Sequence, residues 1–310
     1  MPSPRPLAAL LRGLAGGAEA ARDDHQVRAE LEQRPLALPR GLRITWLGTA
    51  GYRIDHEGHA LLIDPYLSRV PIRDVLLRRR ALPDPTRQDR HLAGVGALAG
   101  ILIGHTHFDH AIDAPAIARR HGCPVLGSSS LTQLMRLHGL GEQAREVEPY
   151  RPYELGPFVV TFVPSRHSKL LLGRKVPFDG ELTCEHVDRL APSAYRCGQV
   201  FGIHVEVAGL RIYHQGSADL IDDAIRHRDV DLFLAGIAGR SVTRDYWPRI
   251  LGRLRPQTVV PSHFDDFFRP LEAPMGFSKG VQLAAFPDEI AAVSREIELA
   301  SLPLLEPRSG

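Results

Sequence analysis

The chain has 310 residues, of which 44% are hydrophobic and 24% are charged, and its formal net charge is +2. That length suffices for one large α/β domain or two small ones, and so small a net charge argues against a nucleic-acid partner. No apolar run approaches the roughly 18 residues that a membrane-spanning helix needs. The three cysteines form no close pair, so we expect no disulfide and a cytoplasmic location: Cys123, Cys184 and Cys197.

Residues 1–40 are predicted to form an N-terminal helical extension, and residues 41–310 the main domain. Four leucines within residues 7–14 share one helical face. This face fits a helix packed on its own domain. It also fits a helix that touches a partner, or a peripheral membrane contact through residues 7–14. No basic segment precedes a long apolar run, so a secretory signal is not expected.

Three short β-type runs follow at residues 42–47, 51–55 and 59–64, separated by glycine-containing turns. They predict a β-meander that opens a sheet. The one tight basic run, Arg78-Arg79-Arg80, lies in a proline-rich stretch. It fits a solvated loop, with a phosphate or nucleic-acid contact as the alternative.

The densest cluster of metal-binding side chains is His105-Thr106-His107-Phe108-Asp109-His110, directly after the apolar run 100–104. Residues two apart in an extended segment point the same way, so His105 and His107 are expected to hold one ion. Asp109 and His110 lie beyond the turn and suit a second ion. Three imidazoles and one carboxylate are typical ligands for zinc, whereas a polar surface loop explains them less well beside a buried strand.

This His-x-His-x-Asp-His signature resembles that of the metallo-β-lactamase superfamily. The segments 44–52 and 62–65 look like the branch with ascorbate-6-phosphate lactonase and N-acyl-phosphatidylethanolamine phospholipase D. The resemblance implies an α+β fold, a four-layer αββα sandwich with the metals at its edge. It also implies that Asp64 hydrogen-bonds a metal-bound histidine, although a turn-forming Asp-Pro is an equal alternative.

The elements after the motif alternate between strands and helices, which fits two sheets with outer helices. Asp113 and Pro115 are expected to begin a helix, with the aspartate as its cap. Residues 168–198 have few periodic elements, and so long a loop is expected to border the site. The further elements are predicted at residues 116–121, 123–127, 130–138, 158–163, 199–207, 210–214, 231–235, 244–254, 257–261 and 288–300, with one or two more strands between 145 and 157.

Two more histidines follow strand ends, and the resemblance assigns both to the metals. His167 comes after the strand ending at residue 163 and matches the third ligand of the first ion. His263 comes after the strand ending at residue 261 and matches the last ligand of the second ion. Asp265 and Asp266 could orient His263, contact substrate or be solvent-exposed.

The bridging carboxylate is where the chain departs from the family. Ser217 stands where the family has an aspartate directly after a glycine, and Asp219 comes two residues later. Asp219 is predicted to bridge the ions if the turn is remodelled, or else to cap a helix. Without the bridge a single metal becomes an alternative, and His214 is a candidate extra ligand.

The sequence therefore predicts a metal-dependent hydrolase with one or two Zn²⁺ ions, with Mn²⁺ or Fe²⁺ as alternatives. Asp109 is predicted to hold the attacking water and accept its proton. The expected substrate is an ester, lactone or phosphodiester of a small or lipid-like compound, and four residues are candidates to bind an anionic group on it: Lys169, Arg174, Lys175 and Arg196. An iron oxidoreductase and a non-catalytic, metal-stabilised interaction protein are the alternatives. No nucleic-acid partner is expected, and no motif indicates an oligomeric state.

Overall fold

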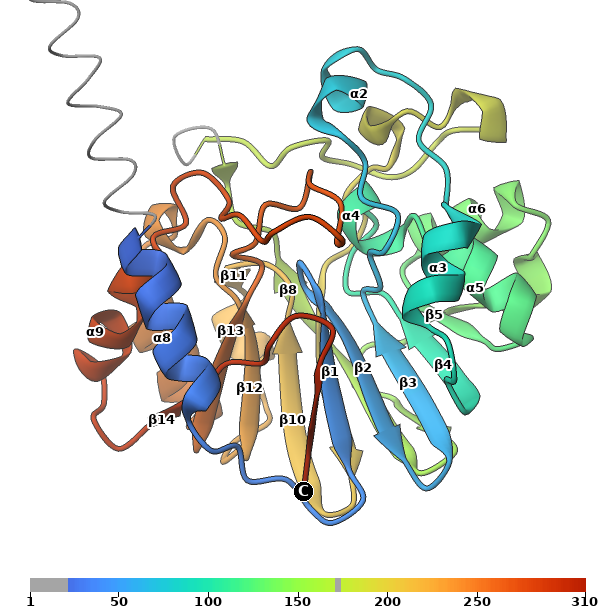
Figure 1. The fold of residues 1–310 in the computed structure, drawn as a ribbon. Helices are drawn as coiled ribbons and strands as arrows, with labels where there is room; N and C mark the ends of the chain where they lie inside the picture. The colour runs from blue at the N-terminus through green and yellow to red at the C-terminus, as the bar shows by residue number, and fades with distance from the viewer. Residues whose placement is uncertain (1–21, 171–173) are drawn as a thin grey trace, which may run out of the picture.

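The computed structural model describes residues 22–170 and 174–310. Two β-sheets lie against each other, with helices on the outer side of each (Figure 1). The predicted α+β sandwich is confirmed. The leucines of residues 7–14 fall outside the described residues, so membrane contact through them stays a prediction.

The first sheet has seven strands in the order β15-β1-β2-β3-β4-β5-β6. The predicted meander β1-β2-β3 is antiparallel, and β3 to β6 are parallel. The strands are β1 Arg43–Gly48, β2 Gly51–His56, β3 His59–Ile63, β4 Ala97–Leu102, β5 Val125–Gly127, β6 Ala144–Glu146 and β15 Pro307–Ser309.

The second sheet has eight strands in the order β11-β8-β9-β10-β12-β13-β14, with β7 paired to β8. The antiparallel set β8-β9-β10 is followed by parallel strands, as in the first sheet, so the two sheets repeat one plan. The strands are β7 Pro152–Leu155, β8 Phe158–Arg166, β9 Phe201–Val207, β10 Leu210–Gln215, β11 Asp219–Leu220, β12 Leu232–Gly236, β13 Thr258–Ser262 and β14 Glu298–Leu299.

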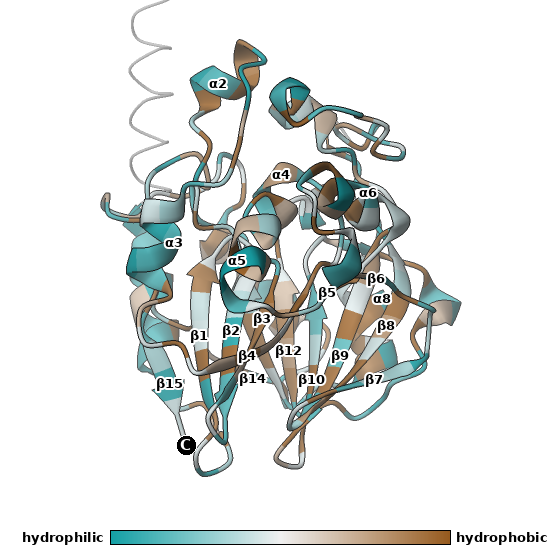
Figure 2. Cartoon of the chain, turned by 90° about the vertical axis from the view of Figure 1, so that its right-hand side faces the viewer, coloured by the Kyte–Doolittle hydropathy of each residue, from teal (hydrophilic) through white to brown (hydrophobic). Residues whose placement is uncertain are grey.

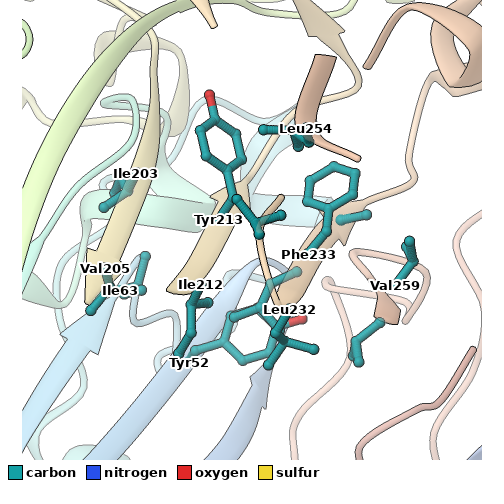
Figure 3. Close-up of a cluster of buried hydrophobic side chains, with 14 of the residues drawn as sticks. Tyr52, Ile63, Ile203, Val205, Ile212, Tyr213, Leu232, Phe233, Leu254 and Val259 are labelled. Atoms are coloured by element: carbon teal, nitrogen blue, oxygen red, sulfur yellow. The ribbon is translucent and has the colours of Figure 1, made fainter. Parts of the chain in front are cut away.

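The main core fills the space between the sheets and continues between the second sheet and its outer helices, because alternate side chains of a strand point to opposite faces. On β3, Leu61 and Ile63 belong to this core, whereas Leu62 belongs to a second core beneath the helices of the first sheet. Figure 3 shows side chains from both sheets meeting in the main core, among them Tyr52 from the first and Ile212 from the second.

Helices cover both outer faces. The helix at residues 22–33 lies beside the second sheet; its Leu31 is 1% exposed in the main core, and Asp24 accepts a hydrogen bond from the Ala284 backbone. The described part of the N-terminal extension is therefore packed on the main domain. The other helices are α2 Ile72–Leu76, α3 Pro85–His91, α4 Phe108–Ala111, α5 Ala114–His121, α6 Ser129–Leu137, α8 Tyr246–Leu254 and α9 Phe286–Ala291.

The helix predicted at residues 288–300 is wrong over its second half. Helix α9 ends at Ala291, and Glu298–Leu299 form strand β14, which pairs with β13. An available strand edge overrode the helical preference of this segment.

The role predicted for Asp113 is also wrong, although α5 begins just after it. Its carboxylate makes no cap hydrogen bond. It instead accepts hydrogen bonds from the Leu67 and Ser68 backbone and from the side chains of Ser68 and Gln88. Asp113 thereby ties the segment after β3 to α3 and α5.

All three cysteines are free, as predicted. None of the helices in the described ranges is long and apolar enough to cross a membrane.

Candidate metal centre

Three strands end at the same edge of the sandwich, and the histidines of the sequence motif lie there. The motif follows β4, and α4 carries Asp109 and His110. His167 follows β8 from the second sheet, and His263 follows β13. Segments far apart in the chain therefore bring their polar side chains to one place.

The first group consists of His105, His107 and His167, whose ligand atoms all lie within 4.8 Å of one another. The Nε2 atom of His105 is 3.1 Å from Nδ1 of His107. The His167 ring centroid lies 4.8 Å from that of His105 and 4.7 Å from that of His107. The three rings thus point their nitrogens into one small space.

The second group consists of Asp109, His110 and His263, again with ligand atoms within 4.8 Å. The Asp109 carboxylate is 3.3 Å from Nε2 of His263 and 3.7 Å from Nε2 of His110. The rings of His105 and His110 lie 3.8 Å apart, so the two groups are adjacent.

Backbone and carboxylate oxygens orient several of these rings. Nε2 of His107 donates to the Pro177 carbonyl at 2.8 Å, and Nδ1 of His167 donates to the Ser168 carbonyl at 2.7 Å. Nδ1 of His110 donates to Asp64 at 2.8 Å, and Asp64 also accepts from the Gly104 backbone at 2.7 Å. In the neutral form of each ring the other nitrogen keeps a free lone pair, which is how proteins present histidine to a metal.

Burial and neighbouring charges together set the protonation of these groups. Burial alone would lower the pKa of His110, but the Asp64 and Asp109 carboxylates raise it. Burial lowers the pKa of His107 to about 4 and that of His167 to about 3, and it also lowers the pKa of His105. The three rings of the first group are therefore neutral near pH 7. Burial alone would raise the pKa of Asp109, but His110 and His263 outweigh it and hold this pKa below its usual range.

The donor set fits a divalent cation. Five imidazoles and one carboxylate converge within the interior, and buried polar groups of this kind need a partner. Nδ1 of His263 is buried and has no hydrogen-bond partner within the described structure. The geometry suits zinc, manganese or iron.

The structure does not bring Asp219 into either group. Its carboxylate accepts a hydrogen bond from the Leu220 backbone and lies 3.5 Å from the Arg249 guanidinium. It starts a two-residue strand rather than a helix. Ser217 is buried, and its hydroxyl accepts a hydrogen bond from the Ser168 backbone. His214 belongs to neither group, and its Nε2 donates to the Ala50 carbonyl at 2.9 Å.

A buried ion pair next to His263 was not predicted. Asp265, for which solvent exposure was one interpretation, is only 2% exposed and lies 2.8 Å from the Arg69 guanidinium. Its other oxygen accepts a hydrogen bond from the Thr49 backbone, whose carbonyl accepts from the His263 backbone. Position 48 is glycine, and a Cβ there would collide with the Arg69 side chain. The pair therefore fixes the segment that carries His263.

A cavity of about 220 Å³ opens onto both groups. Its walls are mostly apolar and include Val75, Leu170, Phe178, Phe267 and Phe268. The predicted border role of residues 168–198 agrees with the position of Leu170 and Phe178. The aromatic run after His263 is a sequence signal for this wall that our prediction did not use.

None of the four basic residues proposed for substrate binding lines this cavity, and all four are exposed. Lys169 lines a second cavity of about 500 Å³ that also reaches His167.

Comparison with known proteins decides the family. A family model described as a β-lactamase superfamily domain matches residues 43–263. The chain belongs to the metallo-β-lactamase superfamily. The predicted enzyme class, a metallo-hydrolase of this superfamily, is supported as well.

Curated relatives of this protein include UPF0173 metal-dependent hydrolases. One from Polynucleobacter asymbioticus is 26% identical over 247 residues, covering 76% of this chain and 78% of the relative. One from Archaeoglobus fulgidus is 25% identical over 260 residues, covering 80% of this chain and 94% of the relative.

Solved structures share the fold of this superfamily member. Igni18, a metallo hydrolase from Ignicoccus hospitalis, has a TM-score of 0.55 at 17% identity and covers 86% of this chain and 97% of its own. YhfI from Bacillus subtilis has a TM-score of 0.53 at 15% identity and covers 88% of this chain and 100% of its own.

Changing Asp64 to asparagine tests how the second group is oriented. The His110 ring and the Gly104 backbone donate to different oxygens of Asp64, and an amide offers only one acceptor oxygen. We therefore expect metal affinity to fall about 10- to 100-fold. Competition with a chromophoric chelator measures this affinity. Asp55→Asn, which changes a β2 carboxylate bound to Arg53, is the matched control, and equal affinities for the two variants would exclude the orienting role.

Proposed function

We propose that this protein uses one or two divalent cations to hydrolyse an ester, lactone or phosphodiester bond in a substrate with a substantial apolar part. The observation that carries the proposal is the pair of ligand groups at the base of an apolar cavity. We assign His105, His107 and His167 to one ion, and Asp109, His110 and His263 to the other. Zinc is the ion that this imidazole-rich set favours.

The assigned residues would hold the ions, and Asp109 would also accept a proton. A bound cation supplies acidity to water and polarises the electrophilic oxygen of a substrate. The chain contributes neutral imidazoles, an ionised carboxylate at Asp109 and a site with restricted access to water. Asp109 is the group we assign to hold the attacking water and accept its proton.

The cavity wall supports an apolar substrate portion. Phe267 and His263 meet edge to face with ring centroids 5.4 Å apart, and Phe268 packs on Phe267 with ring centroids 4.2 Å apart. Phe178, which also lines the cavity, lies 6.4 Å from the His107 ring. A chain or ring held between these aromatic groups would have its scissile bond beside both ligand groups.

Replacing Phe268 with alanine should raise KM for long-chain substrates more than it lowers kcat. The loss of one aromatic wall should reduce kcat/KM about 10- to 100-fold for long acyl chains and little for short ones. Phe277→Ala is the matched control, because Phe277 is a partly buried core residue outside the cavity wall. A uniform loss across chain lengths, or a drop in kcat alone, would argue against this apolar site.

A metal-resolved panel tests the function itself. Zinc, manganese and iron forms would each be assayed on lactone, phosphodiester and thioester substrates of short and long chain length. Turnover of one class by a colourless zinc or manganese form is the expected result.

One alternative is an iron oxidoreductase. CmlA from Streptomyces venezuelae, described as a diiron β-hydroxylase, has a TM-score of 0.53 at 14% identity and covers 88% of this chain. So low an identity supports a shared fold only. Iron with a visible spectrum in protein purified without added metal would favour this alternative over the hydrolase. Full metal occupancy without turnover on the whole panel would favour a non-catalytic, metal-stabilised interaction protein.

A further inference from the structure

The segment of residues 71–80, which we call the α2 turn, exposes an unusual amount of apolar surface. Six large hydrophobic side chains of the described residues are exposed, and three of them belong to this turn: Ile72 at 46%, Leu76 at 74% and Leu77 at 61%. Figure 2 shows α2 at the outer end of the molecule, away from the sheets, with hydrophobic brown segments beside hydrophilic teal ones. A group of exposed leucines in a soluble domain commonly marks an interaction site.

The turn has a defined backbone that holds the leucines outward. The Leu77 backbone donates to the Arg73 carbonyl and the Arg79 backbone to the Asp74 carbonyl, each at 2.9 Å. The base of the turn is anchored by the Ala81 backbone, which donates to the Leu190 carbonyl, and by the Tyr195 hydroxyl, which donates to the Ala81 carbonyl. The leucines are therefore presented by a supported structure.

The turn is also strongly basic. It contains four arginines and one aspartate, a net charge of +3. Asp74 lies 3.3 Å from Arg79 and 3.8 Å from Arg73, whereas Arg78 and Arg80 have no ion pair within the described ranges. Exposed leucines beside free arginines are complementary to a surface with apolar depth and anionic phosphates.

The turn is continuous with the candidate active-site cavity. Val75 on α2 lines that cavity, and so does Leu170, another of the six exposed hydrophobic residues. One side of α2 thus borders the cavity while the other side projects from the molecule. A surface bound to the turn would lie beside the cavity.

We propose that the α2 turn docks the protein on an anionic lipid surface. Leu76 and Leu77 enter the acyl region, and Arg78, Arg79 and Arg80 bind lipid phosphates. A second copy of the chain fits less well, because a symmetric contact would bring two turns of charge +3 together.

Vesicle co-sedimentation of the full chain tests this proposal. Wild type should bind vesicles of phosphatidylcholine mixed with phosphatidylglycerol more tightly than phosphatidylcholine alone, and added salt should weaken binding. The double change Leu76→Ser and Leu77→Ser should reduce binding at least about tenfold. Changing Arg78, Arg79 and Arg80 to glutamine should reduce it on the order of 100-fold.

The matched control is the double change Val242→Ser and Val293→Ser, at two exposed hydrophobic residues outside the turn. It should bind as wild type does. The proposal would be overturned if both α2-turn variants bound vesicles as tightly as wild type, or if wild type did not bind at all. Light scattering without lipid gives a further test. A wild-type dimer that the leucine change dissociates would also overturn the proposal. The readout needs neither metal nor turnover, so its failure leaves the proposed hydrolase intact.

Discussion

Replacing His167 with alanine is expected to remove one metal equivalent and to lower hydrolysis at least about a thousandfold, because a lost cation costs several kcal/mol of transition-state stabilisation. His167 is the member of the first ligand group that comes from the second sheet. The group of Asp109, His110 and His263 keeps all its members in this variant. Metal analysis and steady-state kinetics on the same preparation measure both effects.

The control for this change is His186→Ala, which alters an exposed histidine of the same long loop. It should retain wild-type metal content and activity. If His167→Ala also retained both, then His105 and His107 would not form a metal site with it, and the assignment of the first group would be wrong.

Replacing Asp265 with alanine is expected to destabilise the protein by about 3–5 kcal/mol, since it leaves a buried guanidinium without its partner. The side chains of Arg69 and Asp265 are 1% and 3% exposed, and two of the three Arg69 nitrogens already have no hydrogen-bond partner. The Thr49 backbone would lose its acceptor as well. Urea unfolding with and without added metal measures the loss.

Two further variants separate charge burial from lost packing. Changing Arg69 to methionine together with Asp265 to asparagine removes both charges and should recover much of the stability lost by Asp265→Ala. Asp229→Asn breaks an exposed pair with Arg255, whose side chains are 58% and 54% exposed, and should cost at most about 1 kcal/mol. Equal destabilisation by the buried and exposed changes would refute the role given to the Arg69–Asp265 pair.

The sequence predicted those parts of the fold whose signals are local. Glycine turns between apolar runs mark the β1-β2-β3 meander, and the hairpin of β9 and β10 follows the same logic. Helix α6 was predicted to within a residue, and Ser128 caps it. The periodicity and the turn residues that define these elements lie within their own sequence. Contacts with the rest of the fold therefore changed them little.

Non-local contacts account for the errors. Residues 298–299 form a strand because the edge of β13 is available, and nothing near them in the sequence indicates this. The Asp113 carboxylate accepts hydrogen bonds from residues 67–68 and from α3 rather than capping its own helix. Asp219 lies in a short strand against β8 and near Arg249, so its surroundings depend on elements before and after it.

The residues of the candidate site also divide into those that the sequence predicts and those that only the tertiary fold brings together. His105, His107, Asp109 and His110 form one contiguous motif. The family resemblance, together with their place after strand ends, predicted His167 and His263. The pairing of Arg69 with Asp265 and the cavity wall of Val75, Phe178 and Phe268 require the tertiary fold.

Anomalous diffraction from crystals grown with zinc tests the central assignment most directly. We predict a peak about 2.0–2.1 Å from nitrogens of His105, His107 and His167, with a second peak next to Asp109, His110 and His263 when both sites fill. Zinc peaks that lie only at other residues, or no peak at either group in zinc-saturated crystals, would contradict the account.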